Sequence, residues 1–166
     1  MNHPSVSIRF ATLEDASEIA RLLTQLGHPN TTDDIQSKWP IWVEAGNVAL
    51  VMEGSDGKLA GVATLGCMVT LHRSKPVGRI VAIVVDEACR RQGIGKALVL
   101  AAEEYLRREG CGLVELTSNT KLTDAHQFYQ SLGYRITSYR FMKDLGHPKC
   151  DAAREGSAEH GSGEVQ

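Results

Sequence analysis

The segment with the strongest chemical signal is RRQGIGK, residues 90–96. It lies between an apolar run, residues 79–85, and an amphipathic segment that begins at Ile94. A helix that begins here exposes backbone N–H groups without intrahelical partners, and glycine at 93 and 95 lets an oxyanion approach the main chain closely. The helix dipole and the basic side chains add positive potential. The segment therefore predicts a pyrophosphate-binding site; the alternative is a glycine-containing turn with solvated arginines.

Two nucleotide-binding motifs do not fit these residues. A Walker A loop requires glycine where the chain has Arg90, and serine or threonine where it has Ala97. A dinucleotide-binding fingerprint matches Gly93 and Gly95, but Leu98 occupies its last small position. A nucleotide-phosphate binder is therefore disfavoured.

The elements around this segment alternate between strands and helices. Strands are predicted at residues 7–11, 47–53, 58–71, 79–85, 113–118 and 134–145, and helices at 13–26, 32–44 and from 94 until just before Gly110. A further short helix is capped by Thr123 or Asp124 and ended by Gly133. Pro40 is expected to end or kink the second helix. The continuous apolar run at 79–85 predicts a strand covered on both faces. The pattern indicates an α/β or α+β class with a mixed sheet.

Two motifs resemble the GNAT superfamily of N-acetyltransferases. The RRQGIG segment, R-x-x-G-x-G after an apolar strand, is similar to the superfamily's acetyl-CoA pyrophosphate loop. The segment AHQFYQSLGY, residues 125–134, resembles its following helix. The order of elements from residue 7 to about 145 also fits. The resemblance implies a mostly antiparallel central sheet of about six to seven strands, flanked by about four helices.

The resemblance also implies a binding site for acetyl-CoA as cosubstrate. The pantetheine arm would lie where strand 79–85 splays from strand 113–117, and the pyrophosphate over the glycine loop. Leu122 stands where the superfamily often has an asparagine, a departure that weakens the assignment of Asn119. The residues implied to contact the cofactor are Ile83, Val84, Val85, Arg90, Arg91, Gln92, Gly93, Ile94, Gly95, Lys96, Asn119, His126 and Tyr129.

Acetyl transfer to an amine requires proton removal from the amine and a proton for the departing thiolate. Tyr129 matches the superfamily tyrosine that often acts as this acid; the alternative is core packing beside Phe128. Glu115 is the best-placed base, directly or through water, although a salt-bridged glutamate is the alternative. His72 and His126 also titrate near neutral pH.

The acceptor is expected across the sheet, near the first two helices and the basic loop at residues 72–78. Arg73 and Lys75 could attract an acidic acceptor or form a solvated hairpin. Trp39 and Trp42 could line its pocket or pack.

The composition excludes several other classes. The chain of 166 residues has a net charge of -2 and a pI near 6.3, which gives no electrostatic footprint for nucleic acid. No apolar stretch is long enough to span a membrane, and the N-terminal residues do not resemble a secretory signal. The four cysteines form no metal-binding or disulfide pattern, so a reducing cytoplasm is expected.

These features predict an acetyl-CoA-dependent N-acetyltransferase domain at residues 7–145. Its expected acceptor is the primary amine of a small molecule or a protein. The sequence is also compatible with a homodimer. The alternative function is a non-catalytic CoA-binding regulatory module. Residues 146–166 are small and polar, which predicts a disordered tail.

Overall fold

The structure is a computed structural model that describes residues 7–54 and 57–146. Its contacts divide the chain into two units, Met1–Ile136 and Thr137–Gln166, and each is described by itself.

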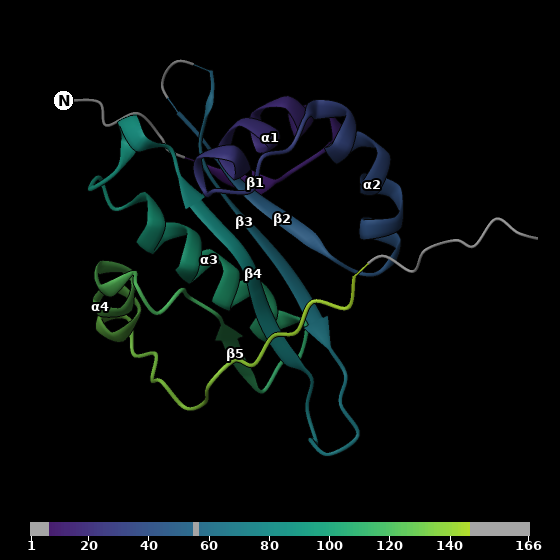
Figure 1. Ribbon diagram of the computed structural model, residues 1–166, viewed down its shortest axis with the longest axis vertical. Helices are drawn as coiled ribbons and strands as arrows, with labels where there is room; N and C mark the ends of the chain where they lie inside the picture. Colours follow the sequence, from purple (N-terminus) through teal and green to yellow (C-terminus); the bar gives the residue numbers. More distant parts are fainter. Residues whose placement is uncertain (1–6, 55–56, 147–166) are drawn as a thin grey trace, which may run out of the picture. The chain divides into compact units, whose positions relative to one another are not determined.

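The first unit contains a five-stranded sheet in the order β1-β2-β3-β4-β5 (Figure 1). The first four strands pair antiparallel, and β5 pairs parallel with β4. The parallel pair requires a crossover, which the longest helix provides. The strands are β1 Ile8–Phe10, β2 Val48–Glu53, β3 Leu59–Met68, β4 Val77–Val85 and β5 Leu113–Leu116.

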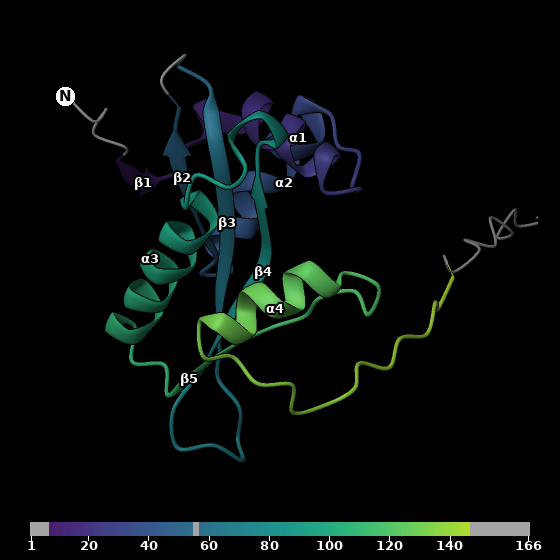
Figure 2. The same ribbon diagram turned by 90° about the vertical axis from the view of Figure 1, so that its left-hand side faces the viewer.

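Helices cover both faces of this sheet. In Figure 2, α1 and α2 lie on one side of the strands and α3 lies on the other. Thr12 and Asp15 begin the first helical segment, where the Asp15 carboxylate accepts the Thr12 N–H at 2.8 Å. The helices are α1 Ala16–Gln25, α2 Thr32–Glu44, α3 Ile94–Arg108 and α4 Thr123–Ser131, with short 3₁₀ turns at Leu13–Asp15 and Glu87–Cys89.

Strand alternation gives the sheet a hydrophobic core on each face. On β2, Leu50 and Met52 pack into the cluster beneath α3, whereas Ala49 and Val51 pack into the cluster beneath α1. From α3, Leu98 is fully buried against the first of these clusters. The sheet is thus fixed from both sides.

A β-bulge interrupts the pairing of β3 with β4. Thr64 pairs with Ala82 and Leu65 with Ile80, so Val81 is an extra residue in β4. Val81 is 57% exposed, and only Ile80 and Val84 are buried within 79–85. The expectation of a strand covered on both faces is confirmed at Ile80, which packs beneath α3, and at Val84, which packs beneath α1, whereas the bulge leaves Val81 exposed.

The predicted class is confirmed: a mixed, mostly antiparallel sheet with four helices. Pro40, which was expected to end or kink the second helix, does not end α2, which continues to Glu44. Two local expectations were wrong. Helix α4 begins at Thr123 with Leu122 as its N-cap, so neither Thr123 nor Asp124 caps it. Within the described residues the sheet has five strands rather than six or seven, because residues 134–145 pair with no strand.

In the second unit, the described residues 137–146 are exposed and form no helix or strand. Tyr139 and Phe141 are 88% and 92% exposed. A strand requires a hydrogen-bonded partner, and none is present for this segment in the described chain. The predicted disordered tail, residues 146–166, lies outside the described residues except for Gly146.

Candidate active site

The loop between β4 and α3 has an unusual main-chain conformation. Gly93 is the N-cap of α3 and has a φ of 80°. Arg91 has a φ of 62°, and it alone among the described non-glycine residues has a positive φ. Such left-handed residues turn successive N–H groups toward one side, an arrangement suited to anions.

The N-terminus of α3 is uncapped. No side chain in the described chain accepts a hydrogen bond from its first turn, and that turn contains no acidic residue. In α2, by contrast, Thr31 and Asp34 cap the first turn, and the Thr31 hydroxyl accepts the Asp34 N–H at 3.1 Å. The first N–H groups of α3 therefore remain available to an outside acceptor, and the helix dipole favours a negatively charged one.

Basic side chains surround this N-terminus. Arg91 and Lys96 are exposed and make no ion pair within the described part of the chain. Arg90 instead turns back: its Nε donates to the Val85 carbonyl at 3.4 Å, and its Nη2 lies 3.4 Å from Glu87. Arg91 and Lys96 thus supply the uncompensated positive charge of the rim.

Gly95 lies in the first turn of α3 without a steric requirement from its protein neighbours. A Cβ atom there would lie 3.5 Å from the Phe128 ring and 3.6 Å from a Val85 methyl group, both ordinary contacts. Glycine near a helix start lowers helix propensity relative to alanine. Packing within the protein therefore does not require glycine at this position.

The edge of β4 beside β5 is open beyond Ile80. The parallel pairing runs from Val77 with Leu113 to Ile80 with Leu116 and stops there. Residues 81–85 have no partner on that side in the described chain. Ile83 and Val85 pack toward the α3 core, and Val84 packs toward α1. The main chain of 81–85 is therefore held firmly while one edge remains unpaired.

Tyr129 packs in an aromatic cluster on α4. Its ring lies edge-on to Phe128 at 5.1 Å and to Tyr134 at 5.8 Å between centroids. Burial raises the pKa of Tyr129 above its ordinary value, which itself lies well above neutral, so the hydroxyl carries its proton at neutral pH. Because Phe128 also contacts the Gly95 position, α4 lies against the first turn of α3.

Asn119 and His126 organise the turn that precedes α4. The Asn119 side-chain oxygen accepts the Lys121 N–H at 2.9 Å. The main-chain carbonyl oxygen of Asn119 accepts the Leu122 N–H at 3.0 Å and lies 2.9 Å from His126 Nε2. These contacts give both residues a positioning role in the turn.

Glu115 forms an ion pair with Arg79, and the two side chains are 2.8 Å apart across the parallel pair. Gly78 faces Leu106 of α3, so the adjacent Arg79 points to the opposite face of the sheet. The pair therefore lies on the face that carries α1 and α2. It is partly exposed to solvent.

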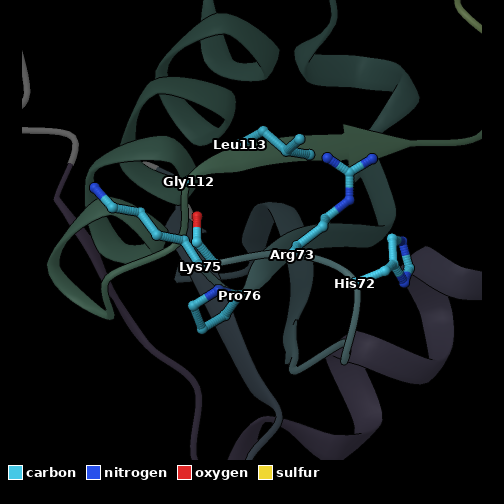
Figure 3. A pocket seen from close by; sticks show the side chains of 7 residues that line it. His72, Arg73, Lys75, Pro76, Gly112 and Leu113 are labelled. Atoms are coloured by element: carbon cyan, nitrogen blue, oxygen red, sulfur yellow. The ribbon is translucent and has the colours of Figure 1, made fainter.

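The predicted basic loop lies at the far end of β4 from the glycine loop. His72, Arg73 and Lys75 line an open cavity of about 400 Å³. Their loop comes before the first residue of β4, whereas the glycine loop comes after the last residue of β4. Strand β4 separates the two by about 26 Å. Figure 3 shows that the Arg73 and Lys75 side chains point in different directions. The structure does not bring this loop to the glycine loop.

Trp39 and Trp42 pack together against the core beneath α1, with ring centroids 5.3 Å apart. Of the two alternatives for this pair, the packing role is the one that the structure shows.

A network that sequence reasoning missed holds the end of β4. Arg21 of α1 contacts the Asp86 carboxylate, donates to Glu18 at 2.8 Å and donates to the Leu59 carbonyl at 2.9 Å. The cationic partner lowers the pKa of both Glu18 and Asp86. Glu18 and Arg21 stand three apart in the sequence, which signals the local pair, but Asp86 is 65 positions from Arg21.

Arg21 and Asp86 also line a cavity of about 280 Å³ that reaches Ala88 and Cys89, just before the glycine loop. The described residues contain no cluster of side chains suited to a metal ion. None of the described helices has both the length and the apolar character needed to cross a bilayer.

Comparison with known proteins agrees with this arrangement. Residues 13–134 match the model of the acetyltransferase (GNAT) family. The chain is 33% identical over 144 residues to an aminoalkylphosphonate N-acetyltransferase of Salmonella typhimurium, covering 86% of this chain and 93% of that protein.

Solved structures have the same fold. An acetyltransferase of Trypanosoma brucei superposes with a TM-score of 0.75 at 30% identity, over 85% of this chain and all of that chain. An aminoglycoside N-acetyltransferase in complex with CoA superposes at 0.74 with 20% identity, over 86% and 96% of the two chains, a likeness in fold alone. Since the family model matches residues 13–134 and the N-acetyltransferase relative covers 86% of the chain, the chain belongs to the GNAT family of acetyltransferases.

Proposed function

We propose that this acyltransferase moves an acetyl group from acetyl-CoA to the primary amine of a small acceptor that carries a phosphonate group. The observation that carries the donor half is the uncapped N-terminus of α3 beside the unpaired edge of β4. The acceptor half is supported by the 33% identity to an aminoalkylphosphonate N-acetyltransferase over most of both chains.

The residues at the start of α3 suit the pyrophosphate of CoA. The N–H groups of Ile94, Gly95 and Lys96 have no side-chain partner in the described chain, and the absent Cβ of Gly95 gives access to them. The positive charges of Arg91 and Lys96 would offset the negative charge of the pyrophosphate. Gln92 and Gly93 lie in the same loop, after Arg91.

The edge of β4 suits the pantetheine arm. Its amide groups would pair with the main chain of Ile83 and Val85, as another strand would. Asn119, His126 and Val84 position the neighbouring loop and strand. Arg90 secures the loop by its contacts with Val85 and Glu87.

Acetyl-CoA supplies a thioester carbonyl that an amine can attack directly. The Tyr129 hydroxyl is protonated at neutral pH, as an ordinary phenol is, and burial raises its pKa further, so the hydroxyl can donate to the departing sulfur. Glu115 is the proposed acceptor of the amine's proton, through water; its carboxylate is held by Arg79 on the face that carries α1 and α2. The amine would then enter from the face opposite α3.

Residues 7–145 form the proposed catalytic domain, which encloses the matched residues 13–134. The proposed location is the cytoplasm, and the proposed assembly is a homodimer. The described cysteines are all free thiols, which suits a reducing compartment.

The test is thiol release from acetyl-CoA over a panel of amines. The panel pairs each aminoalkylphosphonate with its carboxylate and alcohol analogues of equal length. We expect turnover on the phosphonates with kcat/KM at least about tenfold above the analogues, because only the phosphonate carries two negative charges near neutral pH. Calorimetry with CoA measures donor binding separately.

Gly95→Glu supplies the binding control. It adds bulk and negative charge where the pyrophosphate is proposed, so CoA binding should be lost. Gln36→Glu adds the same charge on an exposed position of α2 and should bind CoA normally. Normal CoA binding by Gly95→Glu would contradict the donor site, whereas turnover without preference for phosphonates would contradict only the acceptor class.

A further inference from the structure

Two cysteines meet at the end of α3 that lies away from the glycine loop. The sulfur atoms of Cys67 and Cys111 are 3.2 Å apart although the residues stand 44 positions apart in sequence. Both are free thiols, Cys67 exposed and Cys111 partly buried. An oxidant in solution can therefore reach the pair.

The main chain holds both residues in place. Cys67 is near the end of β3 and pairs with Gly78 of β4 in the sheet. Cys111 donates its N–H to the Leu106 carbonyl at 3.0 Å, and the next N–H, that of Gly112, donates to Pro76 at 2.9 Å. The approach of the two sulfurs is thus a consequence of the fold and not of a loose loop.

The separation is close to what a disulfide needs. A disulfide bond is about 2.05 Å long, so the sulfurs must approach by about 1.2 Å, which side-chain rotation can provide. Cys89 lies in the 3₁₀ turn before the glycine loop and makes no contact with another cysteine in the described chain. The proximity is specific to Cys67 and Cys111.

We propose that Cys67 and Cys111 form a reversible intramolecular disulfide under peroxide. Hydrogen peroxide first oxidises one thiol to a sulfenic acid and releases one water. The second thiol then attacks that sulfur, the S–S bond forms and a second water leaves, so two thiols and one peroxide give one disulfide and two waters. A dithiol reductant reverses the reaction.

The disulfide would tie β3 to the start of β5 and close a loop that contains β4 and α3. Closing a loop of this length restricts the unfolded chain, so the oxidised protein should melt at least about 5 °C higher. The fifteen residues of α3 separate the pair from the glycine loop by about 22 Å. CoA binding should therefore be equal in the two forms.

The experiment treats the full-length wild-type protein with hydrogen peroxide, blocks remaining thiols and digests it with trypsin without reduction. The expected product is peptide 59–73 joined to peptide 109–121, in protein that runs as a monomer on a non-reducing gel. Dithiothreitol should separate the peptides. Overoxidised cysteines without this linkage, or the same linkage only between two copies, would overturn the proposal.

A second measurement uses the Cys89→Ser/Cys150→Ser double variant, in which Cys67 and Cys111 are the remaining cysteines. Peroxide should reduce its free-thiol count from two to none and raise its melting temperature. The matched variant Cys67→Ser should keep a free thiol at Cys111 that sulfenic-acid probes label. Loss of both thiols without the linked peptides would also count against the disulfide.

Discussion

At the scale of single residues, Tyr129 combines packing with a proton that it retains. Its ring belongs to the aromatic cluster with Phe128 and Tyr134, and burial raises its pKa. The two roles considered from the sequence are therefore compatible, because the ring can pack while the hydroxyl serves as an acid.

We expect Tyr129→Phe to lower kcat by about 100-fold, since the ring remains and only the proton donor is lost. CoA affinity measured by calorimetry should stay within about twofold. The matched control is Tyr134→Phe, which removes a hydroxyl from the same cluster and should retain kcat. Wild-type turnover by Tyr129→Phe would remove this residue from the mechanism.

At the scale of elements, the Arg21 network fixes the end of β4 to α1. The hydrogen bonds from Arg21 stabilise the ionised form of Glu18 and of Asp86, and so they lower the pKa of both carboxyl groups. A carboxyl group with a lowered pKa in the folded protein stabilises the fold above its unfolded pKa, about 4. This stabilisation disappears as the pH falls through the lowered values.

Arg21→Ala should therefore destabilise the protein by about 2 kcal/mol at pH 7, and by progressively less below about pH 4. Urea unfolding at several pH values measures both effects. Arg108→Ala is the matched control, because Arg108 pairs with Glu104 on the exposed side of α3 and should change stability little. A loss that is equal at pH 7 and pH 3 would show that the charges do not carry the effect.

The elements also show what the sequence could predict. The 3.6-residue spacing of α3 and the apolar runs of β2, β3 and β4 predicted real elements, because each repeats the pattern of its buried face. Two features involve partners distant in sequence and left no local signal: the bulge at Val81 and the contact between Arg21 and Asp86. Pro40 does not end α2, and Trp39 and Trp42 on either side of it pack against the core beneath α1.

At the scale of the whole first unit, α3 links stability with the candidate site. Its Leu98 and Leu106 are fully buried against the sheet, while its first turn carries the glycine loop. The motif at residues 90–96 predicts an anion-binding site from sequence alone because anion binding depends on local main-chain geometry. The acceptor, expected near the first two helices and the basic loop, depends on segments distant in sequence, and the basic loop lies at the other end of β4 from the glycine loop.

Leu98→Ala should destabilise the protein by about 2–5 kcal/mol, because it leaves a cavity between α3 and the sheet. Leu100→Ala, two residues along the same helix and 48% exposed in the native protein, should change stability by only about 0.5 kcal/mol. Urea unfolding of both variants gives the comparison. Equal losses would mean that α3 does not carry the core.

The end of the β4–β5 pairing at Ile80 has an evolutionary consequence. Under the proposed function, the main-chain N–H and C=O groups at positions 81–85 bind the pantetheine arm of acetyl-CoA. Every amino acid except proline provides the same main-chain hydrogen-bond donor and acceptor. Natural selection on these positions would then act on side-chain volume and on the exclusion of proline. Distant homologues are then expected to differ in amino-acid sequence at positions 81–85 while they bind the same cosubstrate.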